Sequence, residues 1–299
     1  MPITTLSANR NLVGSASGTV QFDGLLTIAN GTYVGSDGVL TLVGGLTVSA
    51  GSFNGGSGNI DNNGAFVLSG GTFTSTTGTF FNASTWTHTA GGTFTHNSGT
   101  VTFDGGSGTS NHNVDTSETF YNLTLNPGGG TKTLAAGDAF IVTGTLTLSN
   151  GNFGGGTIDA RGPIVHGAAF DGGAGGIIDI TAGSDDINLT AGGQMPAVVM
   201  STDRIINGVA SGSVSFDARL TLAAGSFVGG VGDTVFTGLT VSGGTFSGGS
   251  GTLDVNSTFI LSAGTFTATT GNLSVTDWTH TAGGTFIHNS GTVIWDGGS

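Results

Sequence analysis

The chain of 299 residues is poor in several residue types on which most globular folds depend. It has no cysteine, one lysine (Lys132) and one glutamate (Glu118), and only 8% of its residues are charged. The lack of cysteine excludes a disulfide framework and any cysteine-ligated metal site. The scarcity of lysine and glutamate, together with 59 glycines, argues against helices, because good helix formers are missing and no segment keeps a 3.6-residue apolar period.

Basic residues are also scarce, and this scarcity excludes classes of partner. Five Lys and Arg residues against 18 Asp and Glu residues give a formal net charge of -13, which repels nucleic acid and anionic lipid. No run of 18 apolar residues is present, and the first residues do not show a basic region followed by an apolar stretch. We therefore expect no nucleic-acid partner and no membrane insertion.

What the chain has in abundance is repetition over a long period. Residues 1–10 return as residues 195–204, and residues 86–94 return as residues 278–286, so nearly the same offset relates both pairs. Self-similarity of this kind is typical of architectures that grow by stacking. The sequence predicts a first long repeat unit at 1–194 and a second, incomplete unit at 195–299 that is continuous with the first.

A shorter period runs inside the long unit. Triplets that end at Ile28, Val48, Leu68 and His88 recur every 20 residues, and a glycine and an aromatic residue follow each triplet. The glycines are Gly31, Gly51, Gly71 and Gly92, and the aromatic residues are Tyr33, Phe53, Phe73 and Phe94, with Phe227, Phe246, Phe266 and Phe286 in the second copy.

The short period predicts the fold. Alternating apolar and polar residues between glycines indicate short strands that meet at corners, with the apolar residues pointing inward. Stacking of successive coils about 4.8 Å apart would place the eight aromatic residues in a core ladder and the four glycines at corners. We predict an all-β fold, a right-handed parallel β-helix (β-solenoid) with about 20 residues per coil. A β-sandwich array is the alternative, but it requires hairpins and alternating strand directions.

Two stretches break the short rhythm of the sequence, residues 104–122 and residues 163–193. We expect each to form a longer coil or a side loop that projects from one face, where a binding site is most easily built.

Three runs carry a resemblance to a known group of proteins: residues 99–105 (GTVTFDG), 120–125 (FYNLTL) and 144–148 (GTLTL). They resemble the β-helical repeat regions of large bacterial surface proteins, namely adhesins, autotransporter passengers and giant secreted fibre proteins. The resemblance covers essentially the whole chain and brings no catalytic residue with it. It implies an extracellular or cell-surface location and a stalk or fibre built by repetition.

Four kinds of chemistry compete with a purely structural role, and each lacks part of its pattern. The runs ending at Asp61 and Asp254 approach a glycine-rich calcium repeat, but the aspartate is one position late, so calcium is only a weak alternative. His88 and His96 recur as His280 and His288 without a third metal ligand. A polysaccharide lyase or hydrolase would need clustered carboxylates and basic residues, and ice binding would need an unbroken Thr-x-Thr array. We predict no catalytic, cofactor-binding or metal-binding residue.

The function expected from the sequence is structural. The chain would form part of an extracellular bacterial fibre or adhesin shaft, with itself as partner through end-to-end stacking or one continuous covalent array, and with lateral bundling of neighbouring rods. The alternative is an adhesin passenger that binds a host or glycan through projecting loops at 104–122 and 163–193.

Overall fold

The computed structural model describes residues 1–297, and every regular element in that range is a β-strand. The last two residues of the second long repeat, 298 and 299, lie outside the described residues. The chain divides into two compact units, unit 1 up to Leu146 and unit 2 from Thr147. Residues 1–297 contain no helix of the length and apolar character needed to cross a membrane.

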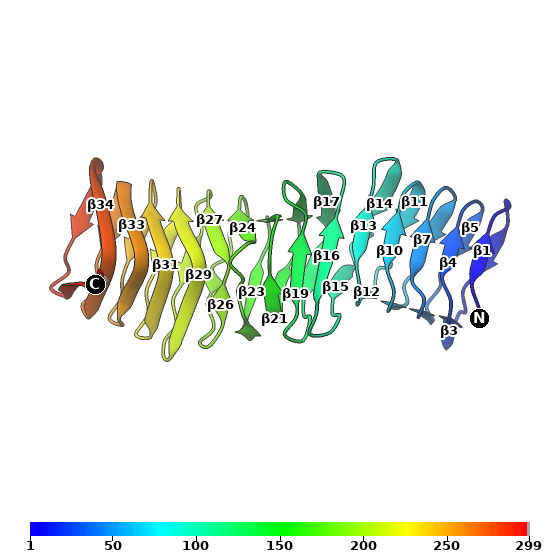
Figure 1. Cartoon of the computed structure of the whole chain (residues 1–299), viewed down its shortest axis with the longest axis horizontal. Helices are drawn as coiled ribbons and strands as arrows, with labels where there is room; N and C mark the ends of the chain where they lie inside the picture. The colour runs from blue at the N-terminus through cyan, green and yellow to red at the C-terminus, as the bar shows by residue number, and fades with distance from the viewer. Residues whose placement is uncertain (298–299) are drawn as a thin grey trace. The chain divides into compact units, whose positions relative to one another are not determined.

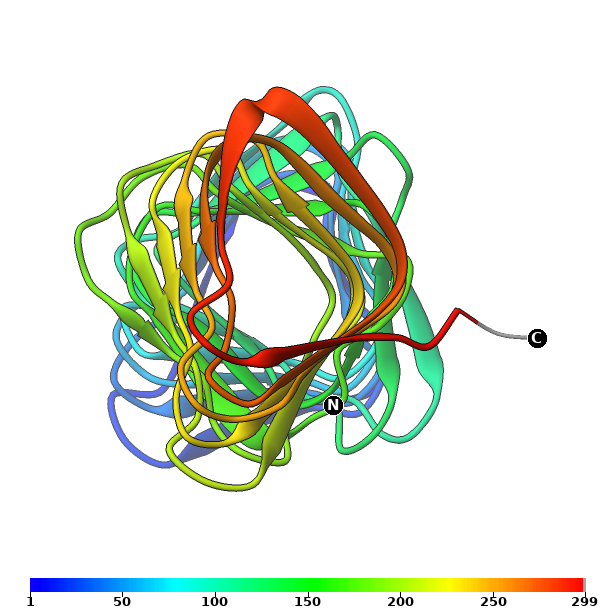
Figure 2. The same ribbon diagram turned by 90° about the vertical axis from the view of Figure 1, so that its left-hand side faces the viewer.

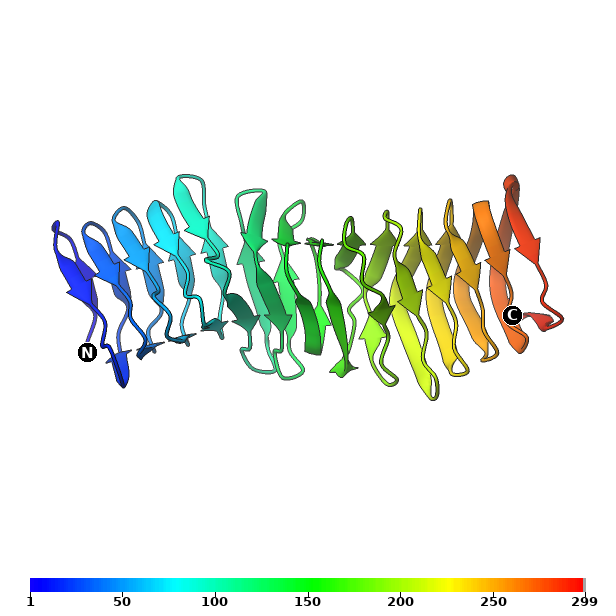
Figure 3. The same cartoon turned by 180° about the vertical axis from the view of Figure 1, so that it is seen from behind.

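Unit 1 is a parallel β-solenoid whose coils contribute strands to three faces. In chain order, the first coil supplies β1 (Thr4–Leu6) to the first face, β2 (Asn11–Val13) to the second and β3 (Thr19–Phe22) to the third. The following coils repeat this order, and their strands lie side by side in Figures 1 and 3. The first face continues with β4 (Leu26–Ile28), β7 (Leu46–Val48), β10 (Phe66–Leu68), β13 (Trp86–His88), β16 (Thr109–Asn113) and β19 (Thr131–Leu134), all parallel.

The other two faces of unit 1 are built in the same way. The second face continues with β5 (Thr32–Val34), β8 (Ser52–Asn54), β11 (Gly71–Thr74) and β14 (Gly92–Thr95). The third continues with β6 (Val39–Leu42), β9 (Ile60–Asn62), β12 (Thr79–Asn82), β15 (Thr100–Phe103) and β18 (Asn122–Leu125). A further parallel pair joins β17 (Ser117–Phe120) to β20 (Ala139–Val142).

Unit 2 uses the same parallel stacking, with strands long enough to bend around corners. One series contains β22 (Thr157–Ala160), β24 (Ile177–Ile180), β27 (Ala197–Met200), β29 (Ser213–Leu222), β31 (Asp233–Val241), β33 (Leu253–Thr267), β34 (Asn272–Ile287) and β35 (Thr292–Trp295). A second contains β25 (Ile187–Asn188), β28 (Ile205–Asn207), β30 (Ser226–Val228) and β32 (Thr245–Ser247), which pairs with β33. The remaining strands are β21 (Leu146–Phe153), β23 (Ile164–Phe170) and β26 (Gln194–Met195).

The predicted fold class is confirmed: the chain is all-β, and its parallel strands stack coil on coil at the predicted short period, as in the register Leu26 to Leu46 to Phe66. Followed from β34 to β35 in Figure 2, the chain winds anticlockwise as it approaches the viewer, which is the right-handed sense. Side chains alternate between the inside and the outside along each strand, so the first and third residues of a triplet form the core. In β4 these residues are Leu26 and Ile28, and both are fully buried.

The eight predicted ladder residues form two stacks, one in each unit. Tyr33, Phe53, Phe73 and Phe94 stack with ring centroids 4.7, 4.8 and 5.8 Å apart. Phe227, Phe246, Phe266 and Phe286 stack at 4.7, 4.6 and 5.9 Å. The last member of each stack is only half-buried, whereas the other six are in the core.

All four predicted corner glycines lie where a β-carbon would clash with the preceding coil, and two of them also need a left-handed backbone. Gly31 and Gly71 have φ of 82° and 68°, the left-handed region that other residues avoid. Gly51 and Gly92 do not have positive φ; a β-carbon there would meet the Gly31 carbonyl oxygen or the Leu68 side chain. Close approach of neighbouring coils, and not backbone conformation, requires glycine at these two positions.

The two irregular stretches behave differently from each other. In 104–122 the register passes from Trp86 to His112, a longer step than the preceding one from Phe66 to Trp86, so this stretch forms a longer coil. In 163–193 the register passes from Ile158 to Ile178 to Val198, which is the regular step. The expectation that 163–193 breaks the coil rhythm is therefore wrong, because the strands on either side of its turns keep their pairing. Gln194 and Met195, on either side of the predicted start of the second long repeat, pair with Ser215 and Phe216 within unit 2.

The ladder should be a principal source of stability. Replacing Phe246 with alanine (Phe246→Ala) removes a fully buried ring between two stacked neighbours, and we expect a loss of about 3–5 kcal/mol in the free energy of unfolding, measured by urea denaturation. Thr245→Ala, at the exposed preceding position of the same strand, should change it by less than about 0.5 kcal/mol. Equal effects of the two substitutions would contradict the assigned core.

Candidate functional site

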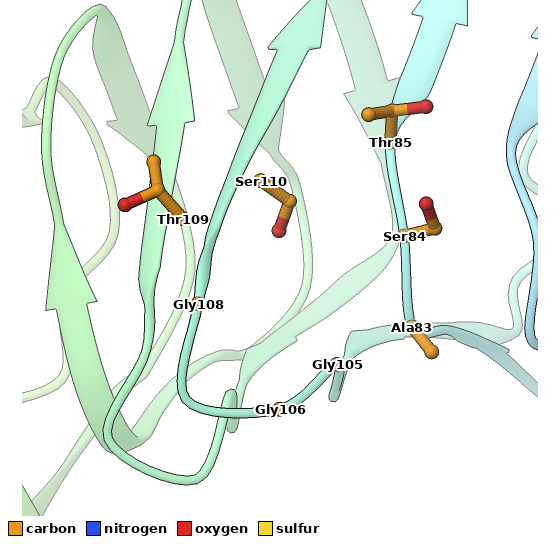
Figure 4. Close-up of a pocket in the computed structure, with 8 residues that line it drawn as sticks. All are labelled: Ala83, Ser84, Thr85, Gly105, Gly106, Gly108, Thr109 and Ser110. Carbon is orange, nitrogen blue, oxygen red and sulfur yellow. The ribbon is translucent and has the colours of Figure 1, made fainter.

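The longer coil in unit 1 opens a cavity between two strands of the first face. Strand β16 has five residues, yet only two of them pair with β13, in the register Trp86 to His112 and Thr87 to Asn113. The segment before β13 and the beginning of β16 therefore separate. The cavity between them measures about 260 Å³ and is lined by Ala83, Ser84 and Thr85 on one side and by Gly105, Gly106, Gly108, Thr109 and Ser110 on the other (Figure 4).

A buried lysine contacts one of these lining residues. Lys132, on β19, is fully buried and is the register partner of Ser110 on β16. Its Nζ donates hydrogen bonds to Ser110 Oγ at 2.6 Å and to the Gly105 carbonyl oxygen at 3.2 Å. Burial lowers the pKa of Lys132, and the nearby charge of Asp104 partly opposes this shift. The site thus holds an amine that loses its proton more easily than a surface lysine.

Asp104 precedes the loop that carries the glycines of the cavity. Burial raises the pKa of its carboxyl group, and within residues 1–297 its Oδ1 has no hydrogen-bond partner. Asp104 and Lys132 form no ion pair, so the lysine keeps Ser110 as its side-chain partner.

His112 lies next along β16 on the inward side, between Trp86 and Leu134 in register. It is 1% exposed and packs against Phe103 with ring centroids 4.4 Å apart. Neither ring nitrogen has a hydrogen-bond partner in the described part of the chain. Burial, reinforced by the charge of Lys132, lowers the pKa of His112 to about 3, so the ring stays neutral at ordinary pH.

A second buried polar pair joins β13 to β17. His88 Nδ1 lies 2.7 Å from Glu118 Oε2, and both side chains are buried. The hydrogen bond from the imidazole to Glu118 raises the pKa of His88, against the opposing effect of burial. His280, the repeat equivalent of His88, is exposed, and its Nε2 lies 2.9 Å from the Gly284 carbonyl oxygen. The two copies of this histidine therefore have different surroundings.

The sequence interpretation placed His88 in the inward column but assigned no role to Ser110, Lys132 or Glu118. A signal for the lysine was present. In the strand Thr131-Lys132-Thr133-Leu134, alternation places Lys132 on the same inward face as Leu134. A lone lysine at an inward position predicts a buried amine that needs polar partners. The partners themselves lie 22 and 27 residues away and have no sequence pattern.

The metal-binding and enzymatic alternatives raised by the sequence each require a cluster of side chains. Within residues 1–297, no three His, Asp or Glu side chains come close enough together to hold a metal ion. Three of the four arginines make structural contacts: Arg161 pairs with Asp159 at 2.6 Å, and Arg204 and Arg219 bond mainly to backbone carbonyls and to Thr240.

Comparison of the chain with protein-family models, with curated proteins and with solved structures gives no match. The cavity is thus described by its own geometry alone: a glycine-rich loop, a ring of hydroxyl groups and a buried amine in contact with one of them.

The buried imidazole of His112 should make the protein sensitive to acid. The unfolded chain takes up a proton on this histidine near pH 6.5, whereas the folded chain does so only near pH 3, so stability falls as the pH drops through this window, by up to about 5 kcal/mol. In His112→Leu this part of the acid loss should vanish, and stability at pH 7 should rise by about 1–3 kcal/mol because two unpaired nitrogens are removed.

Urea denaturation between pH 3 and pH 8 measures both effects. The matched control is His96→Leu, which replaces a half-buried histidine and leaves His112 in place, so the acid loss assigned to His112 should remain. Parallel stability curves for His112→Leu and the unsubstituted protein would show that His112 is not the buried neutral group described.

Proposed function

We propose that the chain is a structural segment of an extracellular bacterial fibre or adhesin shaft. The observation that carries the proposal is the in-register parallel stacking of coil on coil within each unit, with the two aromatic stacks running through the cores. Backbone hydrogen bonds between coils point along the stacking direction, so a pulling force along that direction acts on many of them together.

Two arginines in unit 2 add cross-links along the same direction. Arg204 is 1% exposed and donates to the carbonyl oxygens of Gly162 at 3.0 Å, Ala182 at 3.2 Å and Asp185 at 2.8 Å. Arg219 donates to Thr240 Oγ1 at 2.8 Å and to the Thr258 carbonyl oxygen at 3.4 Å. Each side chain thus ties its own coil to two others, which supports a role in resisting mechanical force.

Exposed apolar side chains support self-association as the mode of assembly. Strand β35 carries exposed apolar side chains, with Trp295 63% exposed and Ile294 38% exposed. We propose that the partner is more of the same repeat stacked on β35, supplied either by a second copy or by a further stretch of one continuous array.

Electron microscopy of the purified chain tests this proposal. We expect particles of uniform width that lengthen as concentration rises, and shorter particles for Ile294→Lys, since an edge lysine opposes strand pairing. The matched control is Ile177→Lys on β24, a strand paired on both sides, where the replaced side chain is also 38% exposed. Particles that stay short at every concentration would contradict assembly through this edge.

The adhesin-passenger alternative has one favourable observation, the exposed loop at residues 106–109 of the longer coil. It predicts discrete particles that bind a host surface or a glycan array and lose that binding when this loop is shortened. Binding without elongation would favour the passenger over the fibre.

A further inference from the structure

The contact between Ser110 and Lys132 has no counterpart in the repeat pattern of the chain. The apolar column of the first face, Leu26, Leu46, Phe66 and Trp86, continues at His112. Ser110 stands two residues before His112, and the corresponding positions of the preceding coils are Gly44, Gly64 and Ser84. Stacking alone gives no reason for a hydroxyl and an amine here. An apolar pair would fill the same positions without the cost of burying a lysine.

Lys132 is arranged as a base. Its Nζ lies 2.6 Å from Ser110 Oγ, the distance at which a proton passes between the two atoms. No carboxylate of the described chain forms an ion pair with it, and burial lowers its pKa, which favours loss of the proton. The Gly105 carbonyl oxygen, 3.2 Å from Nζ, holds the amine in place.

Ser110 is arranged as a nucleophile that a ligand can reach. Its side chain lines the 260 Å³ cavity, which is open to the outside between the segment before β13 and the start of β16 (Figure 4). A cavity of this volume admits a short acyl group.

Two glycines of the loop have backbone amides without a partner in the described part of the protein. Gly106 and Gly108 line the cavity, and each has open space where a β-carbon would be. Within residues 1–297 neither amide donates a hydrogen bond to the protein. Free backbone amides beside an activated serine are the groups that stabilise the oxyanion of acyl transfer.

We propose that Ser110 and Lys132 form a nucleophile–base pair that hydrolyses short acyl esters. Ser110 Oγ attacks the ester carbonyl carbon while its proton passes to Lys132 Nζ. The bond from the carbonyl carbon to the alcohol oxygen breaks, and the proton on Nζ passes to the departing alcohol. Water then attacks the carbonyl carbon of the acyl-serine and gives a proton to Lys132 Nζ. The bond from that carbon to Ser110 Oγ breaks, Nζ returns the proton to Oγ, and the carboxylic acid leaves. Water is the only co-reactant, and no oxidant or reductant is needed.

The acylation half-reaction gives a direct test with p-nitrophenyl acetate as the probe. The full chain is incubated with the ester, and peptide mass spectrometry locates the acetyl group. We expect acetyl on Ser110, none at that position in Ser110→Ala, and release of p-nitrophenol slowed about 10²–10⁴-fold in Lys132→Met. Ser107→Ala is the matched control, because Ser107 is an exposed serine of the same loop outside the cavity lining, and it should react as the unsubstituted protein does.

The pH dependence separates a base from a merely structural lysine. The acetylation rate should rise with pH and level off below pH 10.5, because only neutral Lys132 accepts the proton and burial lowers its pKa. The titratable groups that act on it are Asp104, whose charge raises the pKa of Lys132, and His112, which is neutral above about pH 3. Asp104→Asn should therefore shift the profile to lower pH.

Circular dichroism and thermal unfolding of each variant show whether it is folded. If Lys132→Met does not fold, Ser110→Ala and the pH profile of the unsubstituted protein still decide the question. Acetyl on Lys132 or on surface hydroxyls with none on Ser110, an unchanged rate in Ser110→Ala, or a folded Lys132→Met with the rate of the unsubstituted protein would each overturn the proposal.

Discussion

The parallel pairing of each strand with its equivalent one coil further along is the interaction on which the rest of this structure depends. It fixes which side chains meet, because each residue stacks on its equivalent in the next coil, as Tyr33 stacks on Phe53 and Phe53 on Phe73. It also demands glycine where successive coils approach closely, as at Gly51. Core, corners and surface are all consequences of this one register.

This dependence explains how much of the fold the sequence could predict. Repeated triplets and repeated glycine–aromatic pairs indicated the period, the strand direction and an aromatic ladder, because identical environments select similar residues. Residues 163–193 lack the glycine–aromatic pattern and misled the interpretation, although β22, β24 and β27 keep the regular step. Pairing depends on backbone spacing and inward apolar residues, and Ile178 and Val198 supply these without the rest of the pattern.

The candidate site could not be predicted from the sequence, because its contacts do not repeat. Ser110, Lys132, His112 and the pair of His88 with Glu118 each occur once in that arrangement, and His280 shows that even a repeated histidine can stand in different surroundings. A contact between single residues 22 or 30 positions apart has no periodic signal. Alternation could place Lys132 on the inward face, but only the three-dimensional register shows that Ser110 is what it meets.

In a regular solenoid every coil has the same number of residues and advances the stack by one strand spacing. The longer coil contains more residues but still advances the stack by one strand. The step from Trp86 to His112 takes more chain than its neighbours, yet β13 and β16 still pair as neighbours and β19 follows β16 in register. The additional residues do not pair with the preceding coil, and they form one wall of the cavity. A coil of this kind can change its composition and size while its neighbours keep their pairing, so a repetitive scaffold can acquire a unique site at one turn without redesign of the others.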